Sequence, residues 1–118
     1  MKHIVLVLFL ILTAVSCNKT DEIPLLLPSA AEPSAKLYND RGIEYFYQGK
    51  HTDALISFTQ AKVVDSTAGE IHFNLGLLQH LKGNENKAKN LFRQAKHFAD
   101  GNIKILESKL LKKYLGLN

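Results

Sequence analysis

Residues 35–68, AKLYNDRGIEYFYQGKHTDALISFTQAKVVDSTA, align without a gap on residues 69–102, GEIHFNLGLLQHLKGNENKAKNLFRQAKHFADGN, at an offset of 34 residues. Seven positions are identical, whereas unrelated segments of ordinary composition would share roughly two. The identical pairs are Gly42/Gly76, Gly49/Gly83, Ala54/Ala88, Phe58/Phe92, Gln60/Gln94, Ala61/Ala95 and Lys62/Lys96. A fixed period in this range is typical of stacked helical arrays. The pattern favours a binding scaffold over a catalytic pocket.

The repeated region has the composition and the period of helices. From Ala35 onward the sequence contains no proline, and apolar residues recur three and four positions apart. Glycines placed just after helices, as at Gly49 and Gly83, accept the left-handed backbone conformation at little cost. We predict five helices, over about 35–48, 52–64, 69–82, 86–99 and 103–115.

The shared small residues predict where the helices cross. We expect Gly42 to face Ala54 in the first pair and Gly76 to face Ala88 in the second, because small side chains let helix axes approach closely. The shared phenylalanines, Phe58 and Phe92, are then expected to fill the wedge between successive pairs.

The first segment has the pattern of an export signal. Lys2 and His3 precede an apolar run over residues 4–12, and small residues follow as far as Cys17. The apolar run is too short to span a bilayer, which requires about 20 residues. Cys17 is the only cysteine, so the chain cannot form an internal disulfide.

Residues 18–34 form a predicted linker that contains all three prolines, Pro24, Pro28 and Pro33. Proline lacks an amide donor and favours extended backbone, so we expect an open spacer. The run of leucines at 25–27 has two interpretations. It is either a strand-like stub that packs on the first helix, or a segment that lies in the protein's own groove and competes with a ligand.

The repeated residues resemble the tetratricopeptide repeat, whose pattern has an aromatic residue, Leu-Gly, tyrosine, alanine, phenylalanine and alanine. These positions hold Tyr38, Arg41-Gly42, Tyr45, Ala54, Phe58 and Ala61 in the first repeat, and His72, Leu75-Gly76, Gln79, Ala88, Phe92 and Ala95 in the second. Arg41, His72 and Gln79 depart from the pattern. The resemblance implies an all-α fold, a short right-handed α-solenoid of two helix hairpins closed by a C-terminal capping helix.

The end of the export signal, Ala14-Val15-Ser16-Cys17, resembles the lipobox of bacterial lipoproteins, with Ala14 at a position that usually holds leucine. The resemblance implies cleavage before Cys17 and acylation of that cysteine, with palmitate or a similar chain as a membrane anchor. Asn18 after the cysteine implies the outer rather than the inner membrane of a bacterial envelope, in a periplasmic or surface-facing position. The alternative is an incidental cysteine near an ordinary cleavage site.

The predicted organisation follows from these features. It comprises a lipoprotein signal peptide at 1–16, an acylated cysteine and linker at 17–34, repeats at 35–68 and 69–102, and a capping helix at 103–118. Two and a half repeats are near the minimum for a stable array, which predicts either a marginally stable monomer or a homodimer through the capping helix.

The resemblance also implies a ligand groove on the concave face, lined by the first helix of each pair. The positions that carry over are Asn39, Ile43, Phe46, Tyr47, Phe73, Leu77, His80 and Leu81, continued by Leu111 and Leu115 on the cap. Because the set is mostly apolar, we expect it to bind a peptide or a partner helix. The alternative is that the linker covers these residues, or that they are core because the array is short.

Some family members hold a peptide carboxylate at five positions, and this chain matches only two of them. Asn74 and Lys104 are of the required type, whereas Asn39, Ile43 and Ser108 are not. The carboxylate-binding interpretation therefore mostly fails.

The sequence predicts no catalytic, metal-binding, cofactor-binding or nucleic-acid-binding role. It contains no nucleophile elbow, phosphate loop or paired-acid motif. His72 and His80 are eight residues apart, whereas zinc-binding pairs on a helix are typically about four apart. We expect a lipid-anchored adaptor for protein–protein interaction in the cell envelope. The alternative is a pilotin-like assembly chaperone for an outer-membrane complex.

Overall fold

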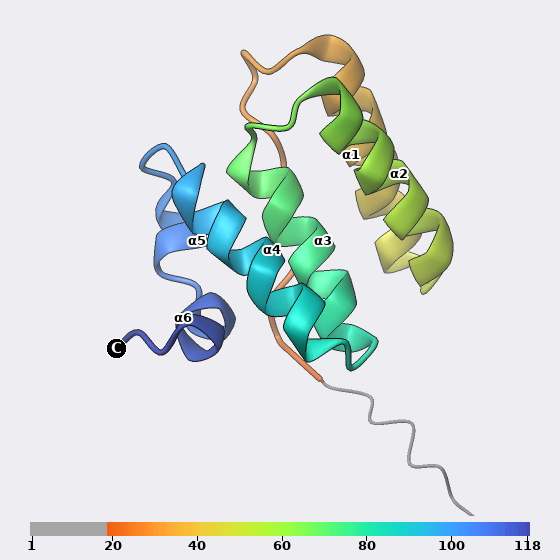
Figure 1. The fold of residues 1–118 in the computed structure, drawn as a ribbon. Helices are drawn as coiled ribbons and strands as arrows, with labels where there is room; N and C mark the ends of the chain where they lie inside the picture. The colour runs from red at the N-terminus through yellow and green to blue at the C-terminus, as the bar shows by residue number, and fades with distance from the viewer. Residues whose placement is uncertain (1–18) are drawn as a thin grey trace, which may run out of the picture.

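The structure is a computed structural model that describes residues 19–118. These residues contain six helices and no strand (Figure 1), which confirms the predicted all-α class. The helices are α1 (Pro33–Tyr47), α2 (His51–Val64), α3 (Gly69–Leu81), α4 (Glu85–His97), α5 (Ile103–Leu106) and α6 (Lys109–Leu115). The predicted signal peptide at 1–16 and Cys17 lie outside the described residues. Within residues 19–118, no helix has the length and apolar character needed to cross a bilayer.

The first four helices form two hairpins that pack in sequence. α1 packs against α2, α3 packs against α4, and α2 joins the hairpins by packing against α3. Equivalent glycines end the first helix of each hairpin, Gly49 with φ 73° and Gly83 with φ 80°. The arrangement of adjacent helix pairs is consistent with a short helical solenoid and compatible with a tetratricopeptide-like repeat.

Each hairpin is closed by a phenylalanine ring that lies on a glycine of the facing helix. A Cβ atom added to Gly42 would be 2.5 Å from the Phe58 ring, and one added to Gly76 would be 3.1 Å from the Phe92 ring. Both rings are fully buried. The glycines therefore make room for the rings. Each glycine faces a phenylalanine that lies four residues after the alanine with which the sequence analysis had paired it.

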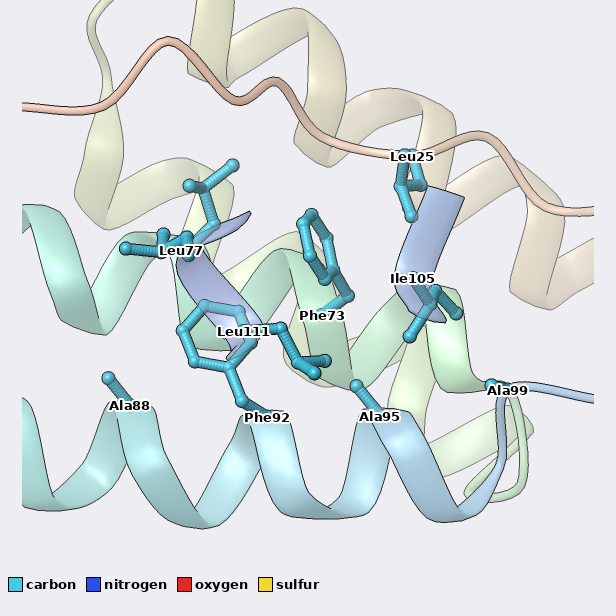
Figure 2. Packing of buried hydrophobic residues seen from close by; sticks show 10 residues of the cluster. Leu25, Phe73, Leu77, Ala88, Phe92, Ala95, Ala99, Ile105 and Leu111 are labelled. Atoms are coloured by element: carbon cyan, nitrogen blue, oxygen red, sulfur yellow. The ribbon is translucent and has the colours of Figure 1, made fainter. Parts of the chain in front are cut away.

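Phe92 also connects the second hairpin to the C-terminal part of the chain. Its ring centroid lies 5.5 Å from that of Phe73 on α3 and 5.3 Å from that of Tyr114 on α6. Figure 2 shows the same cluster, with Leu25 entering it from the extended chain and Leu111 from α6. The ring thus fills the space between the hairpin and the next element, as the sequence predicted.

The C-terminal cap is two short helices, and the prediction of one helix over 103–115 was wrong. α5 ends at Leu106, and the Ser108 hydroxyl accepts a hydrogen bond from the Leu111 amide, 3.1 Å away, to begin α6. The break lets Ile105 and Leu111 both reach the core, where they are fully buried. α5 contacts α3 and α4, and α6 contacts α4, so together they cover the last hairpin.

Replacing Phe92 with alanine tests this packing. Because the ring is fully buried between three helices, Phe92→Ala should lower the free energy of unfolding by about 3–5 kcal/mol. Val63→Ala on α2, where the side chain is 81% exposed, is the control and should change it by less than about 0.5 kcal/mol. Urea unfolding of both variants measures the difference. A loss below about 1 kcal/mol for Phe92→Ala would show that the ring is not core.

Candidate functional site

Two buried asparagines hold the backbone of one residue from the N-terminal segment. Asn39 on α1 and Asn74 on α3 are both fully buried. The Leu25 amide donates to Asn74 Oδ1 at 2.7 Å, and the Leu25 carbonyl accepts from Asn74 Nδ2 at 2.9 Å and from Asn39 Nδ2 at 3.0 Å. Asn74 Nδ2 also donates to Asn39 Oδ1 at 2.9 Å. Both polar groups of the Leu25 backbone are therefore satisfied by side chains.

The segment that carries Leu25 is extended and lies along the second hairpin. Figure 1 shows it as the orange chain that passes behind α3, opposite in direction to that helix, before it turns into α1. Pro24 precedes Leu25, and Pro28 follows at the end of the contact. Proline favours extended backbone and has no amide to leave unpaired, so the local sequence suits a strand with no neighbouring strand.

Alternate side chains of the segment enter the core. Leu25 is 8% exposed and packs in the cluster that includes Phe73 and Leu77, and Leu27 is 5% exposed and packs with Ala35 and Ile71. Successive side chains of extended backbone point to opposite faces. Leu26, between the two, is accordingly 69% exposed. The leucine run thus packs on the first helix, through Asn39 and Ala35, and also on α3, through Asn74 and Phe73. Whether it competes with a ligand stays a prediction.

The structure brings together part of the predicted groove. Asn39 binds the segment directly, and Phe73 and Leu77 lie in the cluster that receives Leu25. Ile43 and Tyr47 line a cavity beside it. Asn39, Phe73 and Leu77 are buried, which fits the alternative that the linker covers these residues or that they are core. Partner binding by this face stays a prediction.

The remaining predicted residues lie toward the ends of the face. Phe46 is half-buried and stacks on His51, with ring centroids 5.7 Å apart. His80 Nδ1 lies 2.7 Å from the Tyr114 hydroxyl, so α6 covers this position. Burial, with the Glu85 carboxylate as a smaller cause, raises the pKa of Tyr114, which keeps its phenol protonated. Leu81 is half-buried at the end of α3.

A cavity of about 570 Å³ remains open beside the bound segment. It is bounded by the segment, by α1 and by α5, and includes Ile43, Phe73 and Lys104 in its lining. Four exposed apolar side chains also line it: Ile23, Leu26, Tyr47 and Ile103, each between 56% and 71% exposed. The groove is thus occupied by the chain itself without being filled.

The beginning of the segment is acidic and lies against a basic part of the cap. Asp21 and Glu22 line a second cavity, of about 280 Å³, together with Lys109 and Lys113 of α6. One carboxylate oxygen of Glu22, Oε2, is buried and has no hydrogen-bond partner among residues 19–118. Two carboxylates and two lysines therefore line the same cavity, and none of these lysines forms a hydrogen bond to Glu22 Oε2.

Two polar residues near the start of α3, Glu70 and His72, are buried away from the groove. Burial raises the pKa of Glu70, and Asp100 and Asp65 act in the same direction. Burial lowers the pKa of His72, whose Nε2 lies 2.7 Å from the Ser66 carbonyl. Both shifts favour the uncharged form. In the part of the chain that the structure describes, no group of three or more His, Cys, Asp or Glu residues could hold a metal ion.

Comparison of the chain with protein-family models, with curated proteins and with solved structures finds no match.

Removing the Asn74 side chain tests the backbone contacts. Asn74→Ala leaves the Leu25 amide without its acceptor in a buried site, which should cost about 1–3 kcal/mol. Asn86→Ala, on the exposed face of α4, is the matched control and should be neutral or slightly stabilising, because alanine favours helix. Thermal and urea unfolding compare the two variants. Equal stability of both would contradict the hydrogen-bond network.

Proposed function

We propose that this protein is a lipid-anchored adaptor of the tetratricopeptide repeat type, which binds an extended segment of a protein partner in a bacterial cell envelope. The observation that carries the proposal is the double contact of Asn39 and Asn74 with the backbone of Leu25. The 34-residue period and the two equivalent hairpins support the repeat type.

An extended partner fits this groove better than a partner helix does. A helix uses its own amides and carbonyls internally, so its middle has none to offer Asn39 and Asn74. Those two side chains are fully buried, and a buried amide without a partner is costly. An extended peptide presents both groups of one residue, as Leu25 does. Backbone contacts of this kind give affinity, and the pockets for alternate side chains give selectivity.

The proposed anchor would keep the groove near the membrane. Leu25 follows Cys17 by eight residues, and an extended chain covers at most about 3.6 Å per residue. An acylated Cys17 would therefore hold Leu25 within about 29 Å of the bilayer surface. A partner at the same membrane would meet the groove at a raised effective concentration.

The mass of the mature N-terminus tests the anchor. Protein extracted from membranes should begin at Cys17 and carry acyl chains on that residue, and Cys17→Ser should release the protein from the membrane fraction. Intact-protein mass spectrometry and membrane fractionation measure both. An unmodified Cys17, or a mature chain that starts elsewhere, would contradict the anchor and leave the groove untouched.

Crosslinking from the groove tests partner binding. A photoreactive phenylalanine analogue at Tyr47, which lines the open cavity and is 63% exposed, should trap a partner in intact cells. The same analogue at Val63 on α2, 81% exposed and outside the cavity lining, is the control. Mass spectrometry should place the Tyr47 crosslink in one segment of one partner. The same adducts from both positions, or none from Tyr47, would contradict the proposal.

A further inference from the structure

The bound segment shows what the groove accepts at each position. Leu25 and Leu27 point inward, whereas Ile23 and Leu26 are more than half exposed. Pro24 is buried beside Leu25. The two leucines that point inward are therefore two residues apart, with the buried Pro24 just before the first and the exposed Leu26 between them.

The N-terminal end of the segment, with Asp21 and Glu22, is acidic and lies beside basic residues of the cap. Residues 103–113 contain four lysines and one acid, Glu107. Glu107 pairs with Lys112 at 2.8 Å, which is the one ion pair within residues 19–118. Lys109 and Lys113 share a cavity with Asp21 and Glu22, and Lys104 shares the larger cavity with the same two acids. The basic surface therefore complements acids three and four positions before the first buried leucine.

The chain's own segment is an imperfect ligand. The cavity of about 570 Å³ stays open beside it, and Glu22 Oε2 is buried without a hydrogen-bond partner in the described part of the chain. A buried carboxylate oxygen that forms no hydrogen bond carries a desolvation cost. A partner segment that fills the cavity, and whose own acid forms the hydrogen bonds that Glu22 Oε2 lacks, would bind more tightly than residues 21–27 do.

The segment can leave without dismantling the hairpins. α1 packs on α2, α2 on α3 and α3 on α4 without the segment, and only residues 28–32, five in number, connect the segment to α1. A linker this short holds its segment at an effective concentration on the order of millimolar. Loss of Leu25 and Leu27 from the core would expose apolar surface, so release should occur by exchange for another segment.

Resting on the groove function proposed above, we infer that the partner is an extended protein segment with two apolar residues that are two positions apart. An acidic pair lies three and four residues before the first of these apolar residues. This partner segment enters by displacing residues 21–27. Those residues have the same pattern and compete with the partner from within the chain. Residues 21–27 thus occupy this part of the groove until a partner segment with the same pattern displaces them.

The test uses a fluorescent peptide with the sequence of residues 19–30 and the full-length chain in detergent. Leu25→Asp in the protein should eject the intramolecular segment, because a carboxylate cannot replace a buried leucine. Leu26→Asp is the matched control, since that side chain is exposed. Fluorescence anisotropy should show binding about tenfold or more tighter to Leu25→Asp than to the unchanged chain or to Leu26→Asp.

A second protein variant keeps the inference testable if Leu25→Asp does not fold. Asp21→Lys with Glu22→Lys leaves the leucines in place and reverses only the charges that face Lys109 and Lys113. It should also bind the peptide more tightly than the unchanged chain. Circular dichroism verifies that each variant remains helical.

Variants of the peptide test the pattern itself. A peptide with Asp21→Asn and Glu22→Gln should bind the opened groove about threefold or more weakly, and added salt should reduce that difference. Leu25→Asp in the peptide should abolish binding, whereas Leu26→Asp in the peptide should leave it unchanged.

Two results would overturn the inference. Equal affinity for all protein variants would show that residues 21–27 do not compete, and equal affinity of all peptides would show that the pattern is not read. If no peptide binds while the Tyr47 crosslink still traps a partner, the assigned pattern is wrong and the groove function stands. If both fail, the groove function fails as well.

Discussion

The structure depends on one constraint: two buried amide side chains, on different helices, must reach the backbone of the same residue. Asn39 and Asn74 can do so only if α1 and α3 are held in a fixed register. The hairpins supply that register, because a phenylalanine ring lies on a glycine in each of them and α2 packs against α3. The close Gly–Phe contacts in the core thus help to position Asn39 and Asn74 beside Leu25.

The two asparagines are buried with the segment in place, and the segment's backbone forms their hydrogen bonds. An amide side chain enclosed by apolar residues costs free energy unless its hydrogen bonds are made. In this chain Leu25 makes them, and its side chain closes the apolar cluster around Phe73 and Leu77. An empty groove would lose both the hydrogen bonds to Leu25 and the apolar contact of its side chain. Exchange of one extended segment for another is therefore favoured over simple opening. The cavity beside the segment is room that a better ligand can use.

The sequence predicted the features that repeat, and it named Asn39 and Asn74 separately without predicting that they act together. Phe58 and Phe92 are 34 residues apart, so comparing the repeats identified them as core. Asn39 and Asn74 are separated by 35 residues, and their repeat counterparts are Phe73 and Asp40, so no periodic signal joins them. The leucines at 25–27 left two interpretations open, because an extended segment can pack on a helix or fill a groove. The break at Ser108 was missed because apolar residues continue across it, and only the cap hydrogen bond marks it.

Asparagine side chains hold the Leu25 backbone. Amide hydrogen exchange of Leu25 in the full chain, measured by nuclear magnetic resonance, tests these contacts. Exchange should be at least about 100-fold slower than in the free peptide of residues 19–30, because the amide must leave Asn74 Oδ1 before it can exchange. Exchange at the rate of the free peptide would show that the Leu25 amide is not held.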